Sequence, residues 1–306
     1  MSGGRHFLVS CPIDLYATVT VELLPGASRF VAPADAPKAA RALALGLDYL
    51  GLSGFGARLE IRSALPRSKG MGSSTADVAG ALYGLAAAAG VRLQPEEVAG
   101  LALAVEPSNS SLFPRLAIFD HRQGTAYEEL GSAPEATLLV VDCGGEVDTL
   151  AYNAVDRRHD LQRLSPRAER ALALLRRGLE QGDLALVGQA ATESALAHQH
   201  ILLKPELSDV LHLGLDLGAI GVCVAHSGTV MGVIFPADRH GDQVPVERLR
   251  QELPHLALLG WHRLVDGGCR DLHVNQVESP LPALVRLPPF EVPTSFRDSF
   301  SRLRAR

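Results

Sequence analysis

The stretch that decides the fold is residues 66–75, Pro66-Arg67-Ser68-Lys69-Gly70-Met71-Gly72-Ser73-Ser74-Thr75. Gly70 and Gly72 can adopt positive φ angles, which would let successive backbone amides point into one concavity. A helix beginning at Ser73 would add free N-terminal amides and the positive end of its dipole. The hydroxyls after Gly72 suit phosphate or magnesium, and Lys69 could add a positive charge. Two interpretations stay open, a phosphate-binding loop or an ordinary loop with a serine cap.

Two other segments carry possible chemistry. An apolar helix predicted over 95–105 delivers Glu106 immediately before Pro107, where its carboxylate could face a cleft and bind magnesium. Taken alone, such an acid is more often a solvated surface group. Residues 225–232, Ala-His-Ser-Gly-Thr-Val-Met-Gly, form a small-residue turn that could approach another loop through its backbone, or else a plain hairpin. Within it, His226 is either a general base or a surface residue.

The composition favours one large or two medium domains with a sizeable core, because the chain has 306 residues of which 47% are hydrophobic. The net charge of -5 gives no overall signature of nucleic-acid binding, although Arg302, Arg304 and Arg306 form a basic tail. No secretory signal or bilayer-length apolar run is recognised. We therefore expect a cytoplasmic protein without a nucleic-acid or membrane partner. The four widely spaced cysteines predict reduced, mostly buried thiols.

Hydrophobic periodicity and turn residues predict an α+β protein. Strands are expected at 7–22 (split at Cys11-Pro12), 57–61, 116–119, 125–130, 136–142, 220–224 and 229–235, and helices at 36–51, 73–89, 95–105, 167–181 and 183–200. The helix at 167–181 is predicted to start with Ser165 as N-cap and Pro166 in the first turn. A break at Pro134 predicts two domains, residues 1–134 and 135–306.

The three segments, in this order, resemble the GHMP kinases, the family named for galactokinase, homoserine kinase, mevalonate kinase and phosphomevalonate kinase. Residues 66–75 are similar to the family loop Pro-x-x-x-Gly-Leu-Gly-Ser-Ser-Ala, with mild departures at Met71 and Thr75. Glu106 lies 32 positions after Ser74, close to the spacing of the family's magnesium-binding glutamate. Residues 225–232 are similar to the family's C-terminal glycine-rich motif.

Within the family, the chain most resembles the L-threonine kinases of cobalamin side-chain synthesis, through residues 105–108, 119–124, 142–149, 189–199 and 225–229. The resemblance implies an N-terminal domain like the second domain of ribosomal protein S5, a ferredoxin-like C-terminal domain, and ATP between them. It also implies a monomer or homodimer that phosphorylates L-threonine with MgATP.

The resemblance further implies roles for individual residues. It assigns catalysis to Ser74 and Glu106, which would also bind magnesium, and we add Asp148 as a candidate catalytic residue because the family's acid is missing. It assigns nucleotide contacts to Pro66, Lys69, Gly70, Met71, Gly72, Ser73, Ser74, Thr75, Ser227 and Gly228. A polar pocket near Asp148 and His226 would orient the acceptor.

Two departures leave alternatives open. The first motif, residues 11–16, lacks the family's Gly-Glu or Asn-Glu pair, and Asn109 stands where threonine kinases tend to carry an acid. Either Asp14 or Asp148 acts as base, or no base is needed, since phosphoryl transfer depends chiefly on alignment and charge neutralisation. The acceptor could instead be homoserine or an isoprenoid-type alcohol, and a weakened nucleotide-binding or regulatory homologue is a third hypothesis. Retention of Ser74 and Glu106 argues against the third.

Overall fold

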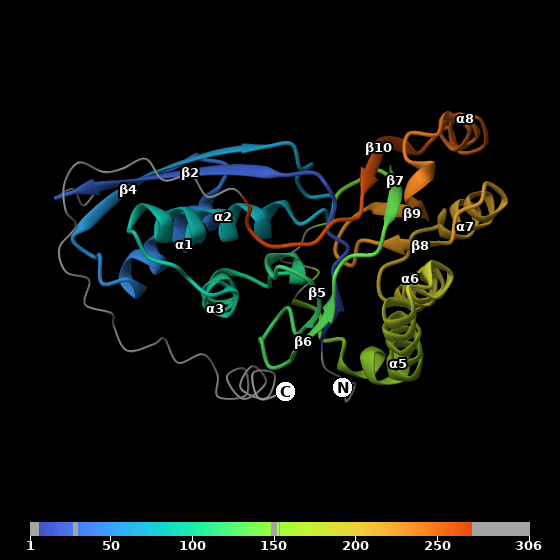
Figure 1. Ribbon diagram of the computed structural model, residues 1–306, viewed down its shortest axis with the longest axis horizontal. Helices are drawn as coiled ribbons and strands as arrows, with labels where there is room; N and C mark the ends of the chain where they lie inside the picture. Colours follow the sequence, from blue (N-terminus) through green and yellow to red (C-terminus); the bar gives the residue numbers. More distant parts are fainter. Residues whose placement is uncertain (1–5, 27–29, 148–151, 153, 271–306) are drawn as a thin grey trace.

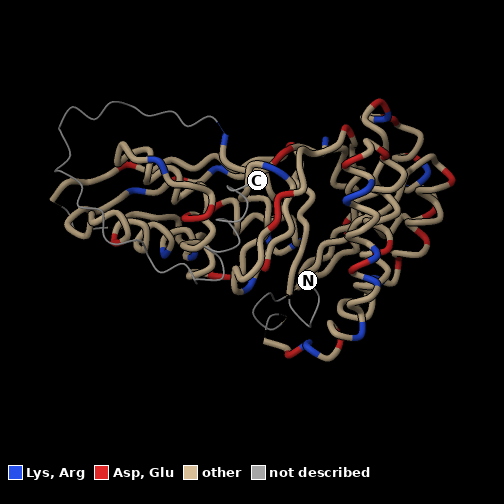
Figure 2. Tube along the Cα trace, turned by 60° about the horizontal axis from the view of Figure 1, so that its bottom comes forward, with Lys and Arg blue, Asp and Glu red and all other residues tan. Residues whose placement is uncertain are grey.

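The structure is a computed structural model that describes residues 6–26, 30–147, 152 and 154–270. Figure 1 shows two blocks of mixed helix and strand lying along the long axis of the molecule, with a small sheet between them. Acidic and basic residues are interspersed along the described chain (Figure 2). Within the described residues, no helix is both long and apolar enough to cross a bilayer.

The N-terminal block is a three-stranded sheet covered on one face by helices (Figure 1). Its elements are β2 (Ala17–Pro25), β3 (Phe30–Val31), β4 (Phe55–Ser63), α1 (Pro37–Tyr49), α2 (Ser73–Ala88) and α3 (Pro95–Val105). Two glycines bring α2 close to β2: a Cβ on Gly80 would lie 2.5 Å from Val19, and one on Gly84 would lie 2.9 Å from Val21. The small residues of α2 therefore let the helix that follows residues 66–75 pack directly on the sheet.

A second small sheet has the order β1-β5-β6 and joins the two blocks (Figure 1). Its strands are β1 (Leu8–Val9), β5 (Leu116–Phe119) and β6 (Tyr127–Gly131), and the short 3₁₀ helix η1 (Ser110–Leu112) precedes β5. The backbone amide of Ser10 donates to the Ser110 hydroxyl at 2.9 Å, which ties the N-terminal segment to η1.

The C-terminal block is an antiparallel sheet of order β10-β7-β9-β8 with helices packed against it. Its elements are β7 (Ala136–Asp142), α5 (Arg158–Gln181), α6 (Leu184–His198), α7 (Leu207–Asp216), β8 (Gly221–Val224), β9 (Val230–Pro236), η2 (Ala237–Arg239), α8 (Gln243–Glu252) and β10 (Ala257–Arg263). In chain order these strands run fourth, first, third, second, which is the ferredoxin-like arrangement. The expected α+β class and C-terminal architecture are confirmed.

The predicted helix start at Ser165-Pro166 is wrong, because α5 begins at Arg158 and contains Pro166. Proline removes one backbone hydrogen bond and normally ends a helix. Here an apolar stripe continues through it at helical spacing: Leu161, Leu164, Ala168, Ala171, Leu172 and Leu175. Packing of this stripe overrides the local preference of proline.

The structure also shows how far the four cysteines are buried. All four cysteines are free. Cys269 is exposed and Cys143 is half-buried, whereas Cys11 is exposed as a residue but its thiol is hydrogen-bonded to Cys223, and this bond and burial raise its pKa, so only some of the thiols are buried as predicted. Cys11 lies on a cleft wall rather than inside a core.

The proposed boundary at residue 134 falls between β6 and β7, yet the chain after β10 returns to the N-terminal block, where Gly268 N donates to Ser111 O at 2.8 Å. The division at 134 therefore stays a prediction, and Arg302, Arg304 and Arg306 lie outside the described residues.

Candidate active site

The loop before α2 has the conformation that its glycines predict. Gly70 and Gly72 have φ angles of 81° and 76°, and Ser68 also has a positive φ of 61°. Gly72 is the N-cap of α2, and no side chain caps the helix. The interpretation of residues 66–75 as a serine-capped loop is therefore wrong, and the amides at the start of α2 are left for another acceptor.

The Ser74 hydroxyl and the Glu106 carboxylate are in direct contact, although 32 residues separate them in sequence. Glu106 is the C-cap of α3, and its side chain is only 10% exposed. Its second carboxylate oxygen forms an ion pair with Lys38, which lies in the first turn of α1. Sequence reasoning missed Lys38, because nothing in residues 36–51 shows that this end of α1 faces α3.

The glycine-rich turn at 225–232 touches the loop through its backbone. The amide of Thr229 donates to the carbonyl of Lys69 at 3.1 Å. A Cβ on Gly70 would lie 2.5 Å from the Ala225 Cβ and 2.8 Å from the Gly228 Cα. The expected close approach is confirmed, and only glycines allow it. Met71 adds an apolar contact to the core of the C-terminal block.

The basic residues of the loop already face carboxylates. Lys69 Nζ lies 2.8 Å from Asp142 Oδ2 and also donates to the Gly145 carbonyl. Arg67 pairs with Asp35 at 3.3 Å and with the buried Asp77 at 3.5 Å. Burial raises the pKa of the Asp77 carboxyl, and the charge of Arg67 lowers it only in part. These ion pairs fix the loop between the two blocks.

Asn109 acts as a structural cap at the position of the missing acid. Its Oδ1 accepts from Ser111 N at 3.0 Å, which begins η1. A Cβ on Gly72 would lie 2.8 Å from its Nδ2, so the amide packs on the loop. The backbone N–H of Asn109 donates to the hydroxyl of the buried Thr75 at 3.3 Å.

Of the two candidate bases, Asp14 lies among the described residues, and it is not at the loop. Asp14 accepts from Arg263 N at 2.9 Å and lies 3.4 Å from His262, so it is held at β10. Asp148 lies outside the described residues.

A group of histidines lies beside the glycine-rich turn. His198 Nε2 and the His226 carbonyl are 2.8 Å apart, and the two rings stack at 4.5 Å. The rings of His6 and His121 meet edge-on at 5.8 Å. Burial lowers the pKa of His121 to about 3, of His198 to about 2 and of His226 to about 4. His226 therefore belongs to a neutral, packed group at pH 7 and is not a plain surface residue.

Acid should destabilise the fold through His198. An unfolded histidine titrates near 6.5, whereas the lowered pKa keeps folded His198 neutral, so below pH 6.5 the unfolded state binds more protons. We expect this residue to cost about 2 kcal/mol of unfolding free energy between pH 7 and pH 5. Denaturant titrations of wild type and His198→Gln should show a shallower loss in the variant. Equal slopes would contradict this assignment, and the exposed His159→Gln is the matched control.

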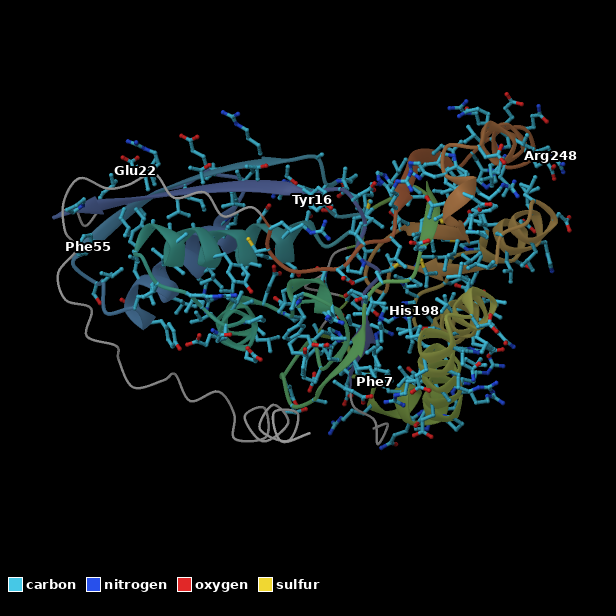
Figure 3. The ribbon with its side chains drawn as sticks, in the orientation of Figure 1. Phe7, Tyr16, Glu22, Phe55, His198 and Arg248 are labelled. Carbon is cyan, nitrogen blue, oxygen red and sulfur yellow. The ribbon has the colours of Figure 1, made fainter. Side chains whose placement is uncertain are left out.

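A large cleft of about 1910 Å³ brings these groups together. Its wall includes Gly70 to Thr75, Glu106, His226 and Ser227, whereas Pro66, Lys69 and Gly228 are not among the residues that line it. His121, Arg122 and the inner faces of α5 and α6 form the opposite side. Figure 3 shows His198 where the two blocks meet. The cleft thus joins the glycine-rich loop and the Ser74–Glu106 pair to a second polar region.

Comparisons with known proteins give a consistent result. The N-terminal domain of the GHMP kinases matches residues 37–113, and their C-terminal domain matches residues 171–254. An L-threonine kinase of Citrobacter freundii is 32% identical over 78% of this chain and 82% of its own length. One from Salmonella typhimurium is 31% identical over 87% and 89%. The L. major mevalonate kinase solved with R-mevalonate has the same fold, with a TM-score of 0.65, 19% identity, and coverage of 88% of this chain and 93% of its own.

Proposed function

Because this chain belongs to the GHMP kinase family, and is therefore a kinase that phosphorylates a hydroxyl group of a small molecule, we propose that its acceptor is L-threonine. The observation that carries the proposal is the identity with L-threonine kinases over most of both chains. The products would be ADP and O-phospho-L-threonine. We further propose that the product supplies the cobalamin side chain, as the resemblance implies, and that the enzyme is a cytoplasmic monomer or homodimer.

The triphosphate of ATP would bind at the loop. The positive φ angles of Gly70 and Gly72 would let the backbone amides of Gly70 to Ser74 point toward the triphosphate, and the uncapped start of α2 would add its dipole. Met71, Thr75 and Ser227 would complete this wall. Pro66, Lys69 and Gly228 would support the loop from behind, since Lys69 is bonded to Asp142 and Gly228 is packed on Gly70.

The Ser74 hydroxyl and the Glu106 carboxylate would hold magnesium. Both are hard oxygen donors in contact with each other, and Mg²⁺ usually takes one or two such protein groups and completes its shell with phosphate and water. Among the described residues, no cluster of three or more metal-binding side chains forms a protein-only cage, and such a cage is not needed here. When bound, the ion would neutralise charge on the transferred phosphoryl group.

Alignment and charge neutralisation would supply most of the catalysis. Asn109 caps η1, and Asp14 is bonded to β10, so neither is placed as a base. The Lys38 ammonium beside Glu106 adds a fixed positive charge at the reaction centre. We keep Asp148 as a candidate for orienting the acceptor.

The test is an ADP-release assay with MgATP across L-threonine, L-homoserine and uncharged alcohols. L-threonine should give the highest kcat/KM. Preference for homoserine would replace the acceptor but keep the kinase, whereas ATP binding without turnover on any acceptor would favour a regulatory homologue. An isoprenoid-type alcohol belongs in the panel as the alternative acceptor, because the apolar stripe of α5 lines the cleft beside the histidines and arginines.

A further inference from the structure

Two arginines line the same cleft as the loop at residues 66–75, which is called the phosphate loop from here on. Arg122 follows β5 in the turn before β6, and Arg157 is the N-cap of α5. Both belong to the cleft wall, together with His121 and Tyr152. These residues come from separate parts of the chain, and the roles proposed above use neither arginine.

Arg157 is a positive charge that no carboxylate of the described residues neutralises through an ion pair. Its guanidinium stacks on the Tyr152 ring at 4.9 Å, which restrains its position. Among residues 6–26, 30–147, 152 and 154–270, no carboxylate forms an ion pair with it, and its buried Nε has no hydrogen-bond partner. By contrast, Lys38, Lys69 and Arg67 each face a carboxylate.

Two described acids near these arginines, Asp120 and Asp156, have other partners. The Asp120 carboxylate accepts from the backbone amides of Arg122 and Gln123 and from the hydroxyl of Thr125, so it closes its own turn. Asp156 is bound by both Nε and Nη2 of Arg158, with Nη2 at 2.7 Å. An unpaired charge in a partly enclosed site is costly, and a ligand carboxylate would remove that cost.

Hydrogen bonds connect this cationic region to the reaction centre. The amide of Ser108, two residues after Glu106, donates to the His121 carbonyl at 2.9 Å. On the other side, His198 bonds the carbonyl of His226, next to the turn that contacts the loop. The charge of Arg157 reaches this group, since it adds to the lowering of the His198 pKa that burial mainly causes. The loop and the arginines therefore line one cleft and are joined by hydrogen bonds through His121 and His226.

We propose that Arg157, with Arg122 beside it, binds the carboxylate of the acceptor and so restricts the substrates to hydroxy acids such as hydroxy amino acids. This inference rests on the proposed function and adds the group that recognises the substrate. Guanidinium matches a carboxylate with two parallel N–H···O bonds. It would also offset the repulsion between that carboxylate and the triphosphate.

The experiment compares L-threonine with L-threoninamide, which keeps the hydroxyl and the amine but lacks the carboxylate. Wild type should prefer L-threonine by on the order of 10²-fold in kcat/KM, because loss of a buried charge partner is expensive. In Arg157→Gln the KM for L-threonine should rise and the preference should fall below about 5-fold, with the KM for ATP unchanged. Arg157→Lys should recover part of the preference.

The matched control is Arg158→Gln, which removes the same charge one residue away at an exposed site. It should keep the wild-type preference, and thermal melting should show that both variants are folded. Equal turnover of L-threonine and its amide by wild type would overturn the inference while leaving the kinase intact. Arg157-dependent turnover of another hydroxy acid, without turnover of L-threonine, would overturn the proposed acceptor and keep the inference. Turnover confined to uncharged alcohols would overturn both.

Discussion

Glu106→Gln should lower kcat by on the order of 10²- to 10³-fold, the effect expected when one preorganised electrostatic group is lost from a transition state. The amide keeps the shape of the side chain but removes the negative charge that faces Ser74 and Lys38. Magnesium would then lose its carboxylate ligand, while the Lys38 ammonium would lose its partner. Initial rates measured against magnesium concentration should show both a lower maximum and a higher half-saturating concentration.

The control for this variant is Glu129→Gln, which removes the same charge from an exposed ion pair with Arg115 at the small sheet β1-β5-β6. It should leave the rates unchanged. Because the Lys38 side chain is 41% exposed, breaking its pair with Glu106 should cost no more than about 1 kcal/mol of unfolding free energy. A folded Glu106→Gln variant with wild-type turnover would remove Glu106 from the proposed mechanism.

The loop geometry was predictable because its determinants are local. Positive φ angles at Gly70 and Gly72 follow from the absence of a Cβ, and α2 follows directly in the sequence. The contact between Ser74 and Glu106 also followed, but only through the spacing known from the family, since tertiary packing of α3 on α2 brings them together. The same residue types in an unrelated fold would not have met.

Features that depend on packing between distant segments were not predictable. Lys38 reaches Glu106 because α1 and α3 are neighbours, and Arg157 enters the cleft because α5 starts seven residues before Ser165 rather than at it. Proline chemistry favoured the later start, whereas burial of the α5 stripe decided the actual one. With a helix start at Ser165, Arg157 falls in a loop of unknown position, and the sequence therefore gives no sign that it lines the cleft.

Gly228→Ala should impair both ATP binding and stability, because the turn at 225–232 and the phosphate loop are in backbone contact. The new Cβ would lie 2.2 Å from the Lys69 carbonyl oxygen and 2.4 Å from the Gly70 Cα. Backbone atoms cannot rotate away as a flexible side chain would, so the two segments must separate. We expect a loss of about 1–3 kcal/mol in unfolding free energy. The KM for ATP should rise roughly 10-fold or more, since misplacement by about 1 Å is costly at a reacting centre.

This position separates a contact effect from backbone strain. Gly228 is not among the glycines with positive φ, whereas alanine at Gly70 would combine a clash with an unfavourable conformation. Gly54→Ala is the matched control, because its added Cβ would meet nothing within 4 Å and its φ is also ordinary. Thermal melting and ATP saturation curves should therefore change in Gly228→Ala alone. If the KM for ATP stays at the wild-type value while stability falls, the turn supports the fold but does not set the loop for the nucleotide.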